Sequence, residues 1–223
     1  KGENAFKKRA FEKALDSLIA HKKEIQSSAD LNGIPNVGKS TITHLSEFLT
    51  TGKILYLDEL KSDKLVNAYI IFKNVYGLGE VSIKKIVESG INDIDGLRSA
   101  FKTDPSILNK KQAIGLKYYE DVLKRIPRSE IDSLNDYILS TNLIPDGMKY
   151  EITGSYRRGL STSGDIDIIV TGEINSFKEM LSRFQSQGII VERLTDGVVK
   201  CLVIGRVPGF ETFRRIDFLY SPP

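Results

Sequence analysis

Apolar positions recur at helical spacing through the N-terminal part of the chain and change to a strand-like alternation toward the C-terminus. The first helical stripe consists of the apolar residues Phe6, Ala10, Phe11, Ala14, Leu15, Leu18 and Ile19. Further helices are predicted over residues 40–49, 65–72, 81–88, 112–123, 127–140 and 177–187. Strands are predicted over residues 149–153, 165–171, 189–194, 198–204 and 212–220. This order predicts an all-helical region followed by an α+β sheet domain.

The changes in pattern divide the chain into three expected domains. We place soft boundaries near residues 60 and 127, with helical domains over 1–60 and 61–127 and a mixed-sheet domain over 128–223. Between two of the predicted strands, an Asp-Gly pair at Asp196 and Gly197 is typical of a β-hairpin turn. The expected fold class is therefore multidomain, α and then α+β.

A short internal repeat places a glycine-bearing turn before two of the predicted helices. Residues 34–38 read IPNVG before the helix at 40–49, and residues 75–79 read VYGLG before the helix at 81–88. Free N–H groups and the dipole at a helix N-terminus favour a phosphate, so two such turns can hold a DNA strand by its backbone. An ordinary helix–helix turn is the alternative for each. Asn36 stands where the second turn has a glycine, but asparagine tolerates left-handed backbone angles.

Three acidic residues on predicted strands suggest a metal centre. Asp165 and Asp167 open an apolar, β-branched run, and residues two apart on a strand point to the same face. Asp217 lies in a second alternating stretch, and it completes a three-carboxylate site if the two strands are neighbours. Hard oxygen ligands suit Mg²⁺. Two such ions activate an attacking hydroxyl and stabilise the leaving oxygens of an in-line phosphoryl displacement.

A candidate phosphate-binding turn precedes the first acidic pair. Gly154 and Ser155 offer backbone N–H groups and a hydroxyl, and Arg157 and Arg158 add fork-shaped donors. Taken singly, each feature has a plainer interpretation, because an Asp-x-Asp sequence is common by chance and a Gly-Ser turn with arginines is usually a solvated loop. Their combination in this order, with a later Asp flanked by apolar residues, is far more specific.

Composition narrows the function classes only slightly. The 223 residues carry a formal net charge of +3, which permits a nucleic-acid partner without requiring one. The sequence contains no long apolar run of membrane-spanning length, so we expect no membrane span. One cysteine, Cys201, excludes an internal disulfide, fits a reducing compartment and, with two histidines, argues against a structural zinc site. The chain begins at Lys1 without an initiator methionine, and we expect it to be a fragment of a longer protein.

Several of these motifs together resemble those of a known protein family. The run GSYRRG at 154–159 followed by SGDIDIIV at 163–170 resembles the nucleotidyltransferase signature of the X family of DNA polymerases, the family of DNA polymerase beta. The segments IGLKYYE at 114–120 and KRIPR at 124–128 are similar to the family's approach to its palm domain. The turns IPNVG and VYGLG resemble its two helix-hairpin-helix turns. The resemblance covers nearly the whole chain and implies two helix-hairpin-helix domains, lyase-type and fingers-type, followed by a palm.

The resemblance implies a role for each matching residue. The two catalytic Mg²⁺ ions, for which Mn²⁺ can substitute, would be bound by Asp165, Asp167 and Asp217. The incoming triphosphate would be contacted by Ser155, Arg158, Gly164 and Arg125. DNA would be contacted at Gly38, Lys39, Gly77, Gly79, Lys200 and Arg215. Na⁺ or K⁺ would be held by the backbone carbonyls of Ile34, Val37, Val75 and Leu78.

Two of these roles have plainer alternatives, and two features depart from the family pattern. Arg215 would orient Asp217 or touch the primer phosphate, but a structural ion pair is an equal alternative, and Lys200 has a solvated lysine as its alternative. His44 stands where the family has the lysine that forms a Schiff base with 5′-deoxyribose phosphate, so we expect lyase activity to be weak or absent. The sequence also ends soon after Asp217, without the family's C-terminal thumb-type subdomain.

The expected function is that of a monomeric, nuclear DNA polymerase that fills short gaps during base excision or related repair. Its partners would be gapped or primer–template DNA and deoxynucleoside triphosphates, with no membrane. Template-independent or end-bridging synthesis by a member of the same family is an alternative. An RNA-tailing nucleotidyltransferase is disfavoured by the tandem turns. A catalytically silent DNA-bridging module is disfavoured by the three acids, because clustered carboxylates without a function only destabilise a fold.

Overall fold

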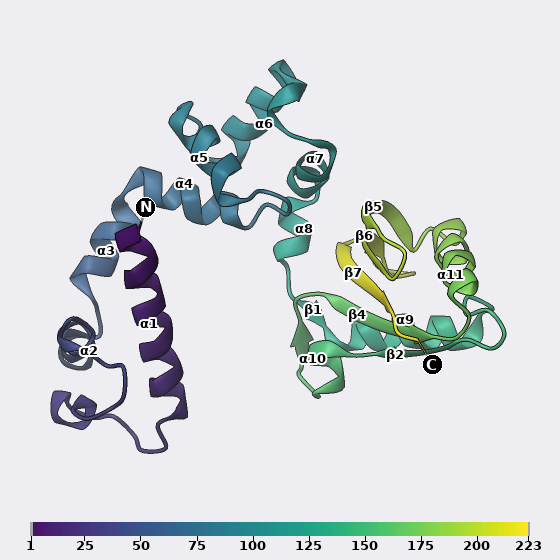
Figure 1. Cartoon of the computed structure of the whole chain (residues 1–223). Coiled ribbons are helices and arrows are strands. Elements are labelled where there is room, and N and C mark those ends of the chain that lie inside the picture. The colour runs from purple at the N-terminus through teal and green to yellow at the C-terminus, as the bar shows by residue number, and fades with distance from the viewer. Residues whose placement is uncertain (1, 223) are drawn as a thin grey trace. The chain divides into compact units, whose positions relative to one another are not determined.

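The computed structural model describes residues 2–222, with side chains from residue 6 onward. These residues form two compact units that divide between Asn67 and Ala68 (Figure 1). Lys1 and Pro223, at the ends of the first and last expected domains, lie outside the described residues. The expected fold class is confirmed, since helical elements come first and a mixed sheet follows. The division into three domains near residues 60 and 127 stays a prediction.

All regular elements among the described residues of the first unit are helices. Its elements are α1 (Gly2–Ala20), η1 (Ser28–Leu31), α2 (Lys39–Thr51), α3 (Leu55–Ser62) and the beginning of α4 (Lys64–Lys73). Asn36, in the turn before α2, has a φ of 64°, which confirms that asparagine takes the left-handed conformation expected there. Gly38 is the N-cap of α2, and Gly52 ends the helix in the left-handed conformation.

The second unit begins with a helical region. It contains the rest of α4, then α5 (Glu80–Glu88), α6 (Ile94–Thr103), η2 (Pro105–Ile107), α7 (Lys110–Lys117) and α8 (Tyr119–Leu123). A buried cluster that includes Phe72, Ile83 and Leu97 holds these helices together. Gly115 of α7 packs against the second glycine-bearing turn so closely that an added Cβ would lie 2.1 Å from the carbonyl oxygen of Tyr76.

A five-stranded mixed sheet forms the rest of the second unit. Its spatial order is β2 (Lys149–Ile152), β4 (Ile166–Thr171), β7 (Phe213–Tyr220), β6 (Lys200–Arg206) and β5 (Ile190–Asp196). The β4–β7 pair is parallel, and the other neighbours are antiparallel. A separate two-stranded ladder joins β1 (Ile126–Pro127) to β3 (Thr162–Ser163), and the four-residue helix α10 (Gly154–Arg157) follows β2.

Two helices, α9 (Arg128–Ser140) and α11 (Ile174–Ser186), cover one face of this sheet (Figure 1). Burial alternates along β4, so that Ile166, Ile168 and Val170 enter the core while Asp167 faces the other side. The core beneath the sheet includes Phe184 of α11. Its ring packs edge to face on the ring of Phe218 of β7, with the ring centres 5.1 Å apart. The face covered by α9 and α11 therefore anchors the strands. The opposite face, part of which packs on α7 and α8, presents the acids.

Most predicted elements are confirmed, with boundaries shifted by a few residues. The hairpin predicted at Asp196 and Gly197 joins β5 to β6. Three local expectations were wrong or incomplete. The helices α3 and α6 were not predicted, the expected helix at 112–123 is interrupted at Tyr118, and the predicted turn at Gly154 opens the short helix α10.

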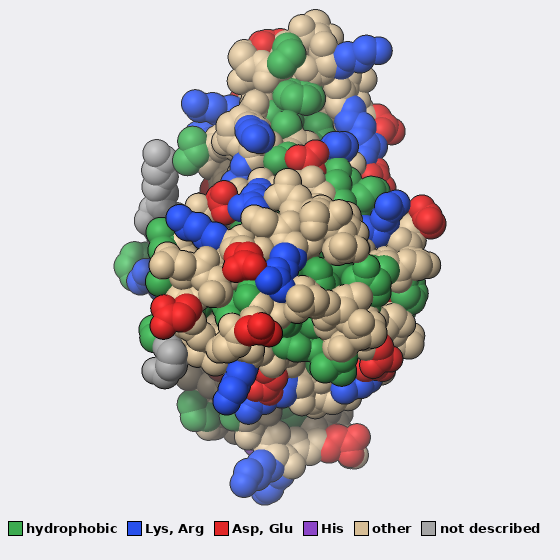
Figure 2. Space-filling view, turned by 90° about the vertical axis from the view of Figure 1, so that its right-hand side faces the viewer, with side chains coloured by type: hydrophobic (Ala, Val, Ile, Leu, Met, Phe, Trp, Pro, Cys, Tyr) green, Lys and Arg blue, Asp and Glu red, His purple; other side chains and the backbone are tan. Residues whose placement is uncertain are grey.

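The surface carries charges of both signs. On the face shown in Figure 2, Lys and Arg side chains are interspersed with Asp and Glu side chains rather than gathered into one patch. This face therefore offers no single basic patch for a nucleic-acid partner. Among residues 2–222, no helix combines the length and apolar character that crossing a membrane requires.

Gly115→Ala is expected to destabilise the second unit by about 1–3 kcal/mol, because the new methyl group overlaps the backbone of Tyr76. Cys201 is a suitable reporter for this unit, because the residue is fully buried and burial raises the pKa of its thiol to about 11. Thiol labelling in increasing urea measures the change. Gly79→Ala, where nothing lies within 4 Å of the added Cβ, is the matched control, and equal stability of the two variants would contradict the close approach.

Candidate metal centre and nucleic-acid interface

The parallel pairing of β4 with β7 brings the acidic residues together. Asp167 and Asp217 are direct partners in the register, and Asp165 lies one residue before β4. Asp165, Asp167 and Asp217 each offer a carboxylate oxygen, and these oxygens lie within 4.8 Å of one another. The condition set by the sequence, that the two acidic strands be neighbours, is therefore met. Three oxygen ligands at this spacing suit a hard divalent cation.

Asp217 is less exposed than Asp165. Its side chain is 14% exposed, and the buried Oδ1 atom accepts no hydrogen bond. Burial raises the pKa of its carboxyl group, Arg215 lowers that pKa, Asp167 raises it and Lys200 lowers it. The net shift is upward, so the ionised form is disfavoured in the protein alone. A buried carboxylate oxygen without a donor is the kind of group that a divalent cation would satisfy, and the residues present fit a metal centre.

Arg215 contacts two of the acids. Its guanidinium forms an ion pair with Asp165, and its Nε lies 3.3 Å from Asp217 Oδ1 without hydrogen-bond geometry. It also lies at 6.0 Å from the centre of the Tyr76 ring. One arginine offsets one of three negative charges, so the cluster keeps a charge that favours cations. Whether Arg215 also touches a primer phosphate stays a prediction.

Gly154 gives Asp167 the room that its position requires. Its φ is 62°, and a Cβ on this residue would lie 2.1 Å from Asp167 Oδ2. Both the backbone angle and the close carboxylate therefore favour glycine here. Sequence reasoning treated this glycine only as part of a phosphate turn and missed its contact with the acid.

The residues predicted to contact a triphosphate lie around β3 and α10. Ser155 Oγ donates a hydrogen bond to Ser163 Oγ at 2.7 Å. Arg125 donates from Nε to Thr162 Oγ1 at 3.1 Å and from Nη2 to the Thr162 carbonyl at 2.6 Å. Its Nη1 lies 3.2 Å from where a Cβ on Gly164 would stand. Arg125 and Ser155 are thus held by the adjacent residues Thr162 and Ser163 of β3.

Arg158 and Lys200 are both exposed, and the structure gives neither of them a role. Arg158 follows α10 at its C-terminal end. Lys200 lies at the start of β6, and strand alternation places it on the sheet face that carries Asp217. The positive charge of Lys200 lowers the pKa of Asp217. Contact of either residue with nucleotide or DNA stays a prediction.

The two glycine-bearing turns have the same local geometry. The Val37 N–H donates to the Ile34 carbonyl at 3.2 Å, and the Leu78 N–H donates to the Val75 carbonyl at 3.1 Å. Each of these two carbonyls keeps a second lone pair for a cation.

Both turns also lead into a helix through a glycine. Gly38 and Gly79 are extended N-caps, Lys39 opens α2, and Gly77 has a φ of 87°. The first N–H groups of a helix have no acceptor within it, so both turns point donors outward from exposed positions.

Sequence reasoning missed several residues that hold the site in place. Thr162 and Ser163 hold Arg125 and Ser155, and only the β1–β3 pairing reveals this. Arg214 was detectable, because the alternation of β7 places it on the buried face beside Ile216. A charged residue at such a position predicts a buried partner, although the sequence does not say which one.

Comparison with known proteins agrees with this geometry. The family model of the DNA polymerase beta palm matches residues 125–223, a helix-hairpin-helix domain matches residues 1–54, and the fingers domain of DNA polymerase lambda matches residues 70–123. Among curated proteins, DNA polymerase lambda of Arabidopsis thaliana is 31% identical over 96% of this chain and 42% of its own length.

Two further relatives align over a similar extent. DNA polymerase lambda of Rattus norvegicus is 27% identical over 95% of this chain and 38% of its own length. The DNA polymerase type-X family protein pol4 of Schizosaccharomyces pombe is 25% identical over 96% and 44%. The chain thus spans about two fifths of the length of the curated relatives it matches.

Helix-hairpin-helix elements followed by a sheet with three acids on the face opposite α9 and α11 define the architecture of a polymerase palm with its helical domains. The chain belongs to the X family of DNA polymerases. The resemblance drawn from the sequence motifs is confirmed.

Asp217→Asn is expected to raise the Tm of the metal-free protein at neutral pH and to abolish most of its stabilisation by Mg²⁺. A raised carboxyl pKa contributes stability below the ordinary value of 3.8, and that contribution is lost as the pH rises through the raised pKa. The ionised wild type is then the form that a cation rescues. Thermal melts with and without Mg²⁺ measure this. For a chain of this size, each kcal/mol added to the free energy of unfolding raises Tm by about 2–4 °C.

The exposed Asp146→Asn serves as the control for that experiment, because it also removes one negative charge. Equal Mg²⁺ stabilisation of the Asp217→Asn variant and the wild type would show that Asp217 binds no metal.

Proposed function

We propose that this chain is the DNA-gripping and catalytic part of a DNA-directed DNA polymerase that fills short gaps during repair. The observation that carries the proposal is the β4–β7 register, which holds three carboxylate oxygens within 4.8 Å of one another on the sheet face opposite α9 and α11. Membership of the X family supports the reaction class. A repair role and a nuclear location rest on the family resemblance alone.

In the proposed reaction the primer 3′-oxygen bonds to the α-phosphorus of a deoxynucleoside triphosphate, and the bond to pyrophosphate breaks. Asp165, Asp167 and Asp217 would hold the two metal ions, and Asp217 would lie nearest the primer hydroxyl. When bound, two Mg²⁺ ions activate that hydroxyl and neutralise charge on the leaving oxygens, and Mn²⁺ can replace them. Arg215, already paired with Asp165, orients the acids.

The phosphate and DNA contacts follow from the surrounding residues. We assign the triphosphate to Ser155, Arg158, Gly164 and Arg125. Their supporting observation is the hydrogen-bonded group that joins Arg125 and Ser155 to β3. The turns at residues 34–38 and 75–79 bind DNA phosphates through helix N-termini, with Na⁺ or K⁺ on the carbonyls of Ile34, Val37, Val75 and Leu78. Lys200 adds a backbone contact, and the protein acts as a monomer.

Incorporation on a duplex with a single-nucleotide gap tests the proposal. With Mg²⁺, the chain is expected to add the nucleotide complementary to the template base. Asp167→Asn is expected to reduce kcat by about 10²–10³-fold, because the cation that would stabilise transition-state charge loses a ligand. The exposed Asp146→Asn is the charge-matched control.

The same assay separates the alternatives. Addition of nucleotides regardless of the template base would indicate a template-independent enzyme of the same family. Binding of gapped DNA without any incorporation would indicate a DNA-bridging module and would contradict the proposal.

We further propose that the first unit grips DNA without lyase activity. His44 stacks on Tyr56, with ring centres 5.4 Å apart, in the wall of a cavity of about 570 Å³. An imidazole cannot form a Schiff base, which needs a primary amine. Lys7 and Lys39 also line this cavity. The lysine expected at the position of His44 is therefore absent, although other amines lie close by.

His44→Lys is expected to create a borohydride-trappable adduct with DNA that carries a 5′-deoxyribose phosphate, because it restores an amine at this position. The unaltered chain is expected to give no adduct under the same conditions. His44→Gln is the control for the loss of the imidazole. Strong trapping by the unaltered chain would refute the proposal and point to Lys7 or Lys39.

A further inference from the structure

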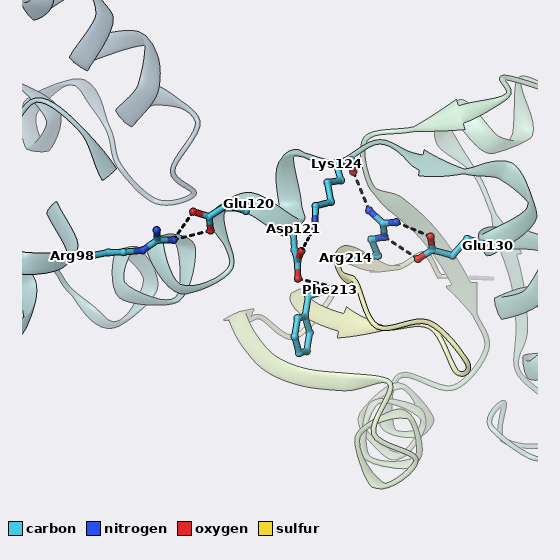
Figure 3. Close-up of polar contacts among 7 residues, drawn as sticks. All are labelled: Arg98, Glu120, Asp121, Lys124, Glu130, Phe213 and Arg214. Atoms are coloured by element: carbon cyan, nitrogen blue, oxygen red, sulfur yellow. Dashed lines mark hydrogen bonds and ion pairs between the residues drawn. The ribbon is translucent and has the colours of Figure 1, made fainter. Parts of the chain in front are cut away.

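A buried ion pair joins the first turn of α9 to the start of β7. Arg214 donates from Nε to Glu130 Oε1 at 2.8 Å and from Nη2 to Oε2 at 2.6 Å (Figure 3). The side chains of Arg214 and Glu130 are 6% and 3% exposed. Replacing a buried pair of this kind by apolar residues is often neutral or stabilising. Stability alone therefore does not explain why charged residues occupy these positions.

The third contact of Arg214 reaches the segment that leads into the palm. Its Nη1 donates to the Lys124 carbonyl at 3.0 Å. Asp121 of α8 fastens the same segment to β7, since its Oδ2 accepts the Phe213 N–H at 3.2 Å and its Oδ1 pairs with Lys124 Nζ at 2.8 Å (Figure 3). Arg214 is thus the residue at which this segment, α9 and β7 are joined.

Each of these three elements carries part of the candidate site. The segment continues into Arg125, which contacts Thr162. Arg128, in the first turn of α9, donates from Nη1 to the Tyr156 carbonyl in the phosphate turn at 2.8 Å. On β7, Arg215 and Asp217 follow Arg214 and point to the opposite sheet face. The triphosphate side and the metal side of the site therefore meet through the pair.

A further ion pair joins α8 to the helical region that precedes it in the second unit. Arg98 of α6 donates from Nη2 to both carboxylate oxygens of Glu120 at 2.7 Å (Figure 3). α8 is thereby tied to the helical region through Glu120 and to β7 through the adjacent Asp121. The orientation of the helical region relative to the sheet is consequently transmitted to the same strand that carries Asp217.

We propose that Arg214, held by Glu130, is a positioning residue that fixes the triphosphate-binding residues at the correct distance from Asp217. It touches neither metal nor substrate and acts through Lys124 and the β7 backbone. This inference rests on the proposed function. Loss of comparable supporting contacts around a metal ligand costs about 10–100-fold in metal affinity or activity.

The test compares Glu130→Leu/Arg214→Met with the unaltered chain. The double variant removes both charges and avoids an unpaired buried ion. Lys117→Met/Glu192→Leu, which removes a more exposed pair between α7 and β5, is the matched control. Readouts are Tm, kcat and nucleotide KM on gapped DNA, and Mn²⁺ affinity by electron paramagnetic resonance, which does not depend on turnover.

The first double variant is expected to stay folded, with Mn²⁺ affinity weakened about tenfold and kcat lowered about 10–100-fold. The control is expected to match the unaltered chain. Unchanged kcat and Mn²⁺ affinity in a folded double variant would overturn the inference. If that variant does not fold, Arg214→Lys decides by the same readouts, because it keeps the charge and loses the bidentate fork. An unaltered chain that binds Mn²⁺ but incorporates nothing would count against the proposed function, and Mn²⁺ affinity would then decide this inference.

Discussion

Mutual repulsion among three carboxylates is the constraint on which the rest of this structure depends. β4 and β7 hold the oxygens of Asp165, Asp167 and Asp217 within 4.8 Å of one another, and Asp217 is largely buried. Such an arrangement is unfavourable unless cations compensate it. Arg215 offsets one of the charges, and the two that remain match a requirement for divalent metal. The helix-covered face of the sheet supplies the rigidity that keeps the acids together despite their repulsion.

The features of this arrangement that depend on neighbouring residues in the chain could be predicted from the sequence. Alternation along β4 placed Ile166 and Ile168 in the core and Asp167 on the opposite face. The glycine-bearing turns were predictable because only a few residue types tolerate left-handed backbone angles, and Asn36 adopts such an angle. The place of Asp217 in the site could be predicted only conditionally, because it depended on which strand lay beside β4. The parallel register that pairs it with Asp167 met that condition.

The remaining features arise from contacts between residues distant in the sequence, which local periodicity does not encode. Glu130 and Arg214 are 84 positions apart, and nothing in their spacing indicates that they form a pair. The contact between Arg215 and Asp165 likewise depends on the sheet register. By contrast, α6 was missed although it carries a local start signal, because Asp93 caps it by accepting the Gly96 N–H at 2.7 Å.

Anomalous diffraction from crystals of this chain soaked with Mn²⁺ and a non-hydrolysable deoxynucleoside triphosphate analogue tests the central claim most directly. The account predicts Mn²⁺ peaks between Asp165 and Asp167, with Asp217 ligating one of the ions and Arg215 moved away from the position a metal occupies. Absence of Mn²⁺ from these carboxylates, with Arg215 still paired with Asp165, would contradict it.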